Sequence, residues 1–337
     1  MYTRRDVGKL ALATLPAVRA FSKISSKIHG VQMGVCGFSY NTLPRQGLLD
    51  VIVNSMVDSG IGDVLLFAPS TEPVELADKA RPARGGGGGF GRGGSGGQGR
   101  GASGGQGRGG GGGRGAANPE QAAAVEALHQ WHLTVSLDYY TAIRKKFADA
   151  GLEIKSFDAS LGAAASEDDL NKACEVTKAL GAHFMMCAVP RSVAKRIAPV
   201  AEKHGVKVGF QGRPNMNSTD PDIMAKPADF EEAMGYSKNF GTCIDVGDAT
   251  GGGWDALKFV QDTHSRVFAL NMKDRTKANV SMPWGQGETH VKEILLLIRD
   301  KKYPIHCYID CEYALPEGST RVAEIKRCME YAKSVLA

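Results

Sequence analysis

Short apolar segments with strand-like composition alternate with amphipathic segments along most of this sequence. Between eight strand-like segments lie stretches whose apolar residues recur every three or four positions, which is typical of helices. Some strand segments, such as HFMMCAV at 183–189, are apolar throughout, as expected for parallel strands covered by helices. This alternation predicts an α/β fold, a (β/α)8 TIM barrel, with a doubly wound sheet as the alternative. The predicted strands are residues 31–37, 63–68, 152–156, 183–189, 206–211, 241–246, 267–272 and 305–310.

One connection in this series has an unusual composition. Residues 85–115 are almost entirely glycine with interspersed arginine, and they separate the second predicted strand from a helix predicted near Asn118. Such a segment buries too little apolar surface to offset the entropy of ordering it, so we expect a disordered, low-complexity insertion. Arginine–glycine repeats also occur in RNA-binding tails. We favour a spacer and expect no nucleic-acid partner, because the tract holds a single aromatic residue and lies inside a domain.

The first twenty residues, MYTRRDVGKLALATLPAVRA, resemble a twin-arginine export signal with a short apolar run and a cleavage-like site. A working leader would make the protein exported or periplasmic, and otherwise we expect it to be cytoplasmic. The net charge of +5 is concentrated in this leader and the glycine tract, and residues 30–337 form the predicted barrel. The sequence has no run of roughly 18 apolar residues, so we predict no membrane span.

The most informative local stretch is GTCIDVGDATGGGWD at residues 241–255. A β-prone run ends there at Asp245, in an Asp-x-Gly-Asp corner that closes with Asp248. A glycine-rich turn then leads into a helix predicted from Trp254. In an α/β barrel the chemistry takes place where the strands end and the following loops begin. Asp245 and Asp248 are therefore candidate site residues.

Three other predicted strands also end in polar side chains. Because side chains alternate along a strand, residues two positions apart share a face, and the apolar alternate face belongs against the helices. Placing this many charged groups inside a barrel costs several kcal/mol unless they are paired, so a functional pocket is the better interpretation. The residues that share the inner face are Gln211 with Arg213, Asn271 with Lys273, and Tyr308 with Asp310 and Glu312.

Several segments resemble the xylose isomerase-like barrel proteins, the sugar phosphate isomerases and epimerases, and in particular an exported branch with an Arg-Arg leader. The most specific segments are Lys273-Asp274-Arg275 and PWGQG at 283–287, with CIDVGDATGGGWDALKFV and KKYPIHCYIDCEYAL beside them. The resembling segments cover nearly all of the barrel outside the glycine tract. The resemblance implies isomerase or epimerase activity on a small-molecule sugar or sugar phosphate, by proton transfer next to a carbonyl.

The resemblance also implies a divalent metal, Mg²⁺ or Mn²⁺, that holds two substrate oxygens. The positions on strands five to eight that bind this metal in the family correspond here to Gln211, Asp245, Asn271 and Asp310. Asp310 and Glu312 would be the catalytic carboxylates that move the proton. The substrate-binding residues implied by the same comparison are Arg213, Asp248, Lys273, Arg275 and Trp284.

Several of these positions depart from the family pattern. An acid or imidazole is replaced by Gln211 and a histidine by Asn271, whereas Asp245 is retained. Amide oxygens coordinate hard cations such as Mg²⁺ or Ca²⁺ but suit Zn²⁺ and Mn²⁺ less well than imidazole does. These departures put the metal in question. The other departures are Arg213 and Asp248 in place of histidine, and Asp310 in place of glutamate.

Two functions therefore stay open. One is a sugar isomerase or epimerase, and the other is a non-catalytic barrel that has kept a sugar- or polyol-binding pocket after losing its metal site. A stoichiometric metal that is lost in Asp245→Ala would favour the enzyme. Absence of metal, with sugars still stabilising the fold, would favour the binding protein. Gly-x-Ser-x-Gly occurs only within the glycine tract, where so many glycines produce it by chance, and the sequence contains no Walker or His-Glu-x-x-His motif. Hydrolase, nucleotidase and zinc-peptidase functions therefore lack their usual signals.

Overall fold

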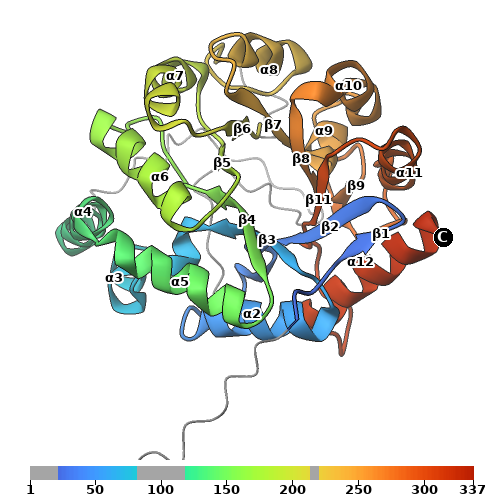
Figure 1. Ribbon diagram of the computed structural model, residues 1–337, viewed down its shortest axis with the longest axis horizontal. Coiled ribbons are helices and arrows are strands. Elements are labelled where there is room, and N and C mark those ends of the chain that lie inside the picture. The colour runs from blue at the N-terminus through green and yellow to red at the C-terminus, as the bar shows by residue number, and fades with distance from the viewer. Residues whose placement is uncertain (1–21, 82–117, 213–219) are drawn as a thin grey trace, which may run out of the picture.

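The computed structural model describes residues 22–81, 118–212 and 220–337. The predicted leader at 1–20, the glycine-rich insertion at 85–115 and the candidate residue Arg213 all lie outside the described residues. The described part forms the predicted TIM barrel, with a central ring of strands surrounded by helices (Figure 1).

Among the described residues, eight parallel strands close into a ring. The strand order is β2-β11-β8-β7-β6-β5-β4-β3, and β3 pairs with β2 to complete the circle. Every bound of these strands lies within two residues of its predicted position. The strands are β2 (Val31–Cys36), β3 (Asp63–Phe67), β4 (Glu153–Asp158), β5 (Phe184–Cys187), β6 (Val208–Phe210), β7 (Phe240–Asp245), β8 (Val267–Met272) and β11 (His306–Ile309). A short β1 (Lys27–Ile28) adds to β2 antiparallel.

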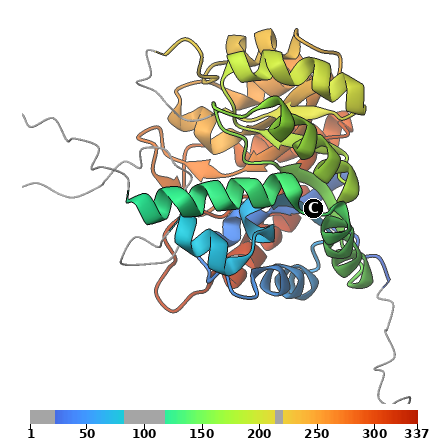
Figure 2. The same ribbon diagram turned by 90° about the vertical axis from the view of Figure 1, so that its left-hand side faces the viewer.

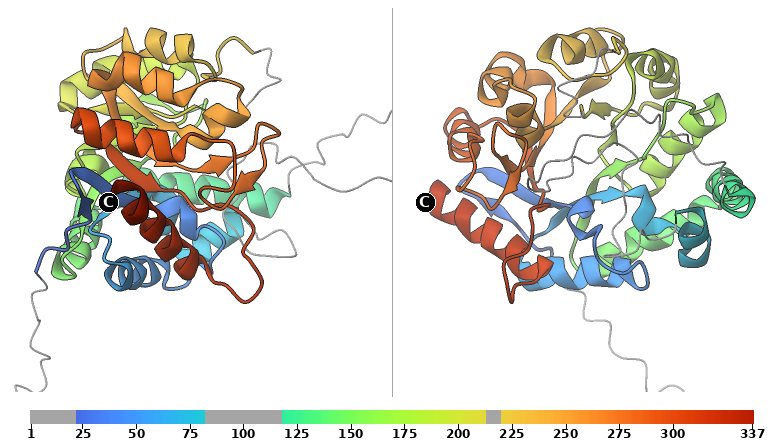
Figure 3. Two further views of the ribbon diagram at one scale, coloured as in Figure 1. Left: turned by 90° about the vertical axis from the view of Figure 1, so that its right-hand side faces the viewer. Right: turned by 180° about the vertical axis from the view of Figure 1, so that it is seen from behind.

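The helices cover the outside of this ring, as the side views show (Figures 2 and 3). Capping residues mark several of their starts: Ser166 forms a capping box at α6, and Thr320 caps α12. The last helix packs against α2 and β1, so the end of the chain closes the ring beside its beginning. The longer helices are α2 (Leu48–Ser59), α4 (Pro119–Thr134), α5 (Leu137–Asp149), α6 (Glu167–Ala179), α7 (Arg191–His204), α11 (Val291–Lys301) and α12 (Arg321–Leu336). The shorter ones are α3 (Val74–Ala80), α8 (Pro227–Met234), α9 (Val246–Gly251) and α10 (Ala256–Thr263).

The core has two parts, and the alternation of side chains along the strands separates them. The larger cluster lies between the outer faces of the strands and the helices. The smaller one lies inside the ring and includes Cys36, Leu65, Met186, Cys243 and Tyr308. The cysteines of the described residues form no disulfides with one another and are buried, as small apolar residues are expected to be. The interior is therefore packed, and the chemistry is confined to the end of the barrel where the strands finish.

One local prediction at this end is wrong. The sequence indicated a glycine-rich turn after Asp245, but α9 begins immediately after β7. The helix predicted from Trp254 is present as α10, which starts at Ala256. The side chain of Asp245 accepts a hydrogen bond from the backbone N–H of Asp248, so it caps α9 and starts the helix at once. Asp255 caps α10 in the same way. Nowhere in the described residues is there a helix long and apolar enough to cross a membrane.

Candidate active site

The corner after β7 places its two carboxylates over the end of the neighbouring strand. Asp245 is the last residue of β7, and Asp248 lies three residues on, in the first turn of α9. Between them, Gly247 packs directly on the backbone of Lys273. A Cβ at Gly247 would lie 2.9 Å from the Lys273 carbonyl oxygen and 3.0 Å from its Cβ, closer than real Cβ atoms approach. The glycine therefore lets α9 contact the end of β8.

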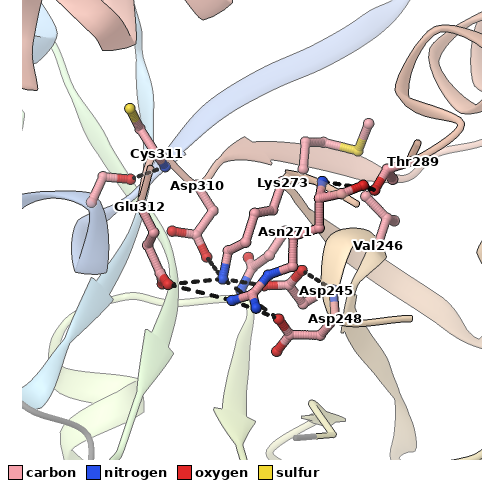
Figure 4. A network of polar contacts seen from close by, with 12 residues as sticks. Asp245, Val246, Asp248, Asn271, Lys273, Thr289, Asp310, Cys311 and Glu312 are labelled. Carbon is pink, nitrogen blue, oxygen red and sulfur yellow. Dashed lines mark hydrogen bonds and ion pairs between the residues drawn. The ribbon is translucent and has the colours of Figure 1, made fainter. Parts of the chain in front are cut away.

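Lys273, directly after β8, lies at the centre of the site (Figure 4). Its Nζ lies 2.7 Å from Oδ2 of Asp245, 3.1 Å from Oε2 of Glu312 and 3.4 Å from Oδ2 of Asp310. Asp248 Oδ1 is the fourth neighbour, at 3.8 Å. Strand register explains the convergence, because the β7–β8 and β8–β11 pairings align the ends of these strands. One ammonium group is therefore shared by four carboxylates from three parts of the barrel.

A second cation, Arg275, lies at the outer side of the same cluster. Its Nη2 is 3.2 Å from Oδ1 of Asp248 and 3.9 Å from Oε2 of Glu312. Its Nη1 donates a hydrogen bond to Oδ1 of Asn279, which holds the guanidinium in place. Four carboxylates and two cations give these side chains a formal charge of −2. We refer to Asp245, Asp248, Lys273, Arg275, Asp310 and Glu312 as the charge cluster.

The cluster displaces the pKa of two of its members. Burial of Lys273 opposes its charge, but the surrounding carboxylates, Asp245 foremost, outweigh it and raise its pKa well above the usual range. Burial and the adjacent charge of Asp245 raise the pKa of Asp248 to about 6, against the attraction of Lys273 and Arg275. The lysine therefore stays an ammonium, whereas Asp248 exchanges a proton near neutral pH.

The comparisons with known proteins agree with this architecture. The sequence pattern of the xylose isomerase-like TIM barrel matches residues 121–335, which is more than half of the chain. The chain belongs to this family. A search of curated proteins gives no match.

Three solved structures illustrate the similarity in fold. A sugar phosphate isomerase/epimerase from Parabacteroides distasonis ATCC 8503 has a TM-score of 0.55 and 16% identity, covering 94% of this chain and 98% of that one. An L-ribulose 3-epimerase has a TM-score of 0.56 and 11% identity, covering 91% and 95%. A D-allulose 3-epimerase from Methylomonas sp. in complex with D-allulose has a TM-score of 0.53 and 10% identity, covering 93% and 99%. At these identities the likeness concerns the fold.

Two of the four positions expected to bind a divalent metal in this family are engaged by a lysine instead. Asp245 and Asp310 both face Nζ of Lys273. Gln211 and Asn271 are buried after β6 and within β8, and they offer amide rather than charged oxygens. Nowhere in residues 22–81, 118–212 and 220–337 do three His, Cys, Asp or Glu side chains form a group that could hold a metal. The donor set of the described residues therefore does not fit a divalent ion.

The other predicted site residues divide into two groups. Asp245, Asp248, Lys273, Arg275, Asp310 and Glu312 come together in the charge cluster (Figure 4). Asn271 lies next to them on the inner face, where its Nδ2 is buried with no hydrogen-bond partner among the described residues. Trp284 is placed elsewhere: its Nε1 donates to the backbone oxygen of Met272, and its ring packs against Tyr331 of α12. It supports the end of β8 through these contacts.

Asp274, whose individual role sequence reasoning missed, organises the loop beside the cluster. Its carboxylate accepts hydrogen bonds from the backbone N–H groups of Gly285, Gly287 and Thr289. The pairing of β9 (Asp274–Arg275) with β10 (Ser281–Met282) brings the loop back onto the end of β8. The sequence signal was present, because an acid followed by a glycine-rich PWGQG stretch is suited to capturing backbone N–H groups. Asp274 thereby fixes the backbone on either side of Lys273 and Arg275.

A cavity of about 430 Å³ lies between α4 and α6 beside the ends of β3 and β4. Its walls are mostly apolar, and two histidines of α4 contribute to them. His129 Nε2 lies 2.7 Å from Asp169, and His132 Nε2 lies 3.0 Å from the buried Glu72. Burial lowers the pKa of His132 to about 4, so its imidazole is neutral at physiological pH. Both histidines are paired wall residues in this cavity.

Proposed function

We propose that this protein acts on a sugar or sugar derivative by moving a proton next to a carbonyl group. The observation that carries the proposal is the charge cluster, in which carboxylates with different environments surround two fixed cations at the active end of the barrel. Proton transfer next to a carbonyl needs a base, a proton donor and positive charge near the oxygen. The cluster supplies all three.

The residues of the cluster differ in how well they suit each role. Glu312 is the most exposed of the carboxylates, with 21% of its side chain accessible, so it is the group that can meet a substrate C–H bond. Asp248, with 12% accessible and a pKa of about 6, is the group that can hold and return a proton near neutral pH. Lys273 and Arg275 supply positive charge between them.

In the proposed reaction, Glu312 removes the proton from the carbon next to the carbonyl of an open-chain sugar. The C–H electron pair becomes the new carbon–carbon π bond, and the carbonyl π pair moves onto oxygen. Lys273 and Arg275 stabilise this negative charge through the low-dielectric interior of the site. Protonated Asp248 returns a proton to the enediolate, which leaves Glu312 protonated and Asp248 ionised. Exchange with solvent restores both carboxyl groups.

The relatives support the substrate class. Solved structures with the same fold are named as a sugar phosphate isomerase/epimerase, an L-ribulose 3-epimerase and a D-allulose 3-epimerase bound to D-allulose. All three names denote rearrangement at carbons next to a carbonyl of a sugar. This agreement favours a ketose or aldose, with or without a phosphate, as the ligand of the pocket.

Solvent exchange gives a direct test. The protein is incubated in D₂O with a panel of ketoses, aldoses and their phosphates, and ¹H NMR follows deuterium entering the carbon next to the carbonyl. We expect exchange with at least one sugar, reduced about a hundredfold or more in Glu312→Gln, because the general base is then missing. Asp262→Asn, an exposed substitution on α10, serves as the matched control and should leave the rate unchanged. Exchange with none of the sugars, or an undiminished rate in Glu312→Gln, would contradict the proposal.

Binding without turnover is the second candidate. The observation that favours it is the enclosure of Lys273 and Asp310, whose side chains are 4% and 3% accessible. A cluster closed on itself can still bind sugar hydroxyls without reacting, with Glu312 accepting hydrogen bonds from them and Arg275 donating hydrogen bonds to them. The same NMR samples separate the two functions, because a sugar that raises the melting temperature but takes up no deuterium marks a binding protein.

A further inference from the structure

The Lys273 ammonium lies where a bound metal ion would need its carboxylate ligands. Its Nζ lies within 3.4 Å of oxygens from Asp245, Asp310 and Glu312, which is the number of protein ligands that often surrounds a catalytic cation. The ammonium is therefore located where three carboxylates from the ends of two strands, β7 and β11, point inward. A divalent ion would need these same oxygens at about 2.0–2.6 Å.

We propose that the Lys273 ammonium is the permanent cation of this pocket and that the pocket works without a divalent metal. In this arrangement a covalently attached charge balances the carboxylates, and it does so at every metal concentration. The proposal concerns the cation alone and does not depend on which sugar is bound, or on whether any sugar is turned over.

The side chain has no room to withdraw from this position. Its accessible fraction is 4%, and the backbone of Gly247 packs against its own backbone and Cβ. The preceding residue is fixed as well, because the carbonyl oxygen of Met272 accepts hydrogen bonds from the Asp310 backbone N–H and from Trp284 Nε1. A metal ion would therefore have to displace a buried, charged side chain from several carboxylate partners at once, which is strongly unfavourable.

A divalent ion entering the cluster would meet the Lys273 ammonium itself. Two cations would then share one set of carboxylates. Asp245, Asp310 and Glu312 cannot ligate the ion at its normal distances while Nζ holds them at 2.7–3.4 Å.

Removal of the ammonium should turn the cluster into a metal site. In Lys273→Ala the formal charge of the cluster changes from −2 to −3, and the volume occupied by Nζ becomes free. The three nearest carboxylates then need to move inward by roughly 0.5–1.2 Å to reach metal–oxygen distances of about 2.2 Å. Lys273→Met also removes the charge but keeps the volume filled. Lys277→Ala, at an exposed lysine that pairs only with Glu288 among the described residues, is the matched control.

The experiment measures Mn²⁺ binding by electron paramagnetic resonance and calorimetry on the full chain of each variant, after treatment with a chelator. We expect Lys273→Ala to bind one Mn²⁺ per chain at least about tenfold more tightly than the wild type, Lys273→Met and Lys277→Ala. If Lys273→Ala is unfolded without metal, recovery of the fold on addition of Mn²⁺ supports the proposal. Failure to recover, equal affinity in all four proteins, or a stoichiometric Mn²⁺ site in the wild type would overturn it.

A sugar readout on the wild type keeps this proposal separate from the proposed function. D-allulose is the probe, and its effect on the melting temperature is measured with EDTA and with Mn²⁺ present. We expect the same stabilisation in both, whether or not the sugar is turned over. Stabilisation seen only with Mn²⁺ would overturn the metal-independence of the pocket, whereas absence of stabilisation in both would count against D-allulose as a ligand and leave the Mn²⁺ result to decide the cation.

Discussion

Replacement of Asp248 by asparagine tests the electrostatics of the charge cluster through stability. Burial and the neighbouring carboxylate of Asp245 raise the pKa of Asp248 from 3.8 to about 6. An acid whose pKa is higher in the folded than in the unfolded chain destabilises the fold above its folded pKa, and this penalty is absent below its unfolded pKa. The contribution of Asp248 to the free energy of unfolding should therefore fall as the pH rises from about 4 to about 6.

The size of this effect follows from the same displacement. Each pKa unit corresponds to about 1.36 kcal/mol, so ionised Asp248 should lower the free energy of unfolding by about 3 kcal/mol at pH 7. Roughly 0.5 kcal/mol of this penalty is already present at pH 4, which lies slightly above the ordinary pKa of 3.8. Asparagine has nearly the same volume and no titrating group. The difference in unfolding free energy, Asp248→Asn minus wild type, should therefore grow by about 2–2.5 kcal/mol in favour of the variant between these two pH values.

Urea denaturation followed by tryptophan fluorescence at several pH values between about 4 and 7 measures this difference. Comparison of two proteins at each pH cancels the contributions of all other titrating groups that the substitution leaves unchanged. Asp262→Asn, which alters an exposed ion pair with Lys258, should show no comparable pH dependence. A difference for Asp248→Asn that is constant over this range, or that grows in favour of the wild type, would refute the reasoning.

Three further substitutions test the support around the cluster. Asp274→Asn should lower the free energy of unfolding by about 1–3 kcal/mol and speed amide hydrogen exchange in loop 285–289, because it weakens three charge-assisted hydrogen bonds. Trp284→Phe should cost about 1 kcal/mol through the lost bond to Met272 without altering sugar binding, as measured by calorimetry. Tyr308→Phe should cost about 1 kcal/mol in urea denaturation, because it leaves a buried serine hydroxyl of β4 without its acceptor.

The sequence predicts the barrel strands closely because their signal is local and strong. Apolar runs of four to six residues mark β3, β5 and β8, and parallel strands covered by helices need that composition. The short helices α3 and α9 carry no comparable signal. The helix α9 has only six residues, VGDATG, and its apolar residues do not recur at helical spacing. It forms because Asp245 caps it and because Gly247 permits close packing on Lys273.

The sequence predicts which residues form the charge cluster, but it does not predict how their side chains are arranged. A period of two places Lys273, Asp310 and Glu312 on the inner face, and the structure brings them together. Which atom occupies the centre depends on side-chain length and on the register between strands that are distant in sequence. The order of residues alone does not show that Nζ of Lys273 reaches the position where a metal was expected.

Trp284 is a predicted site residue that the structure does not place in the charge cluster. It belongs to the sequence segment that most specifically resembles the family, yet its ring packs toward α12 and its Nε1 binds the backbone of Met272. A motif can be specific because it shapes a loop rather than because it touches a substrate. Asp274, which gathers the backbone N–H groups of that loop, explains why the segment has its glycines.

The deciding measurement is the rate of deuterium uptake by D-allulose with the metal-free wild type and again after Mn²⁺ is restored. If carboxylates transfer the proton while the Lys273 ammonium supplies the cation, uptake proceeds at the same rate, within about twofold, in EDTA and in Mn²⁺. Uptake that appears only with Mn²⁺, or rises more than about tenfold with it, would contradict this role of Lys273.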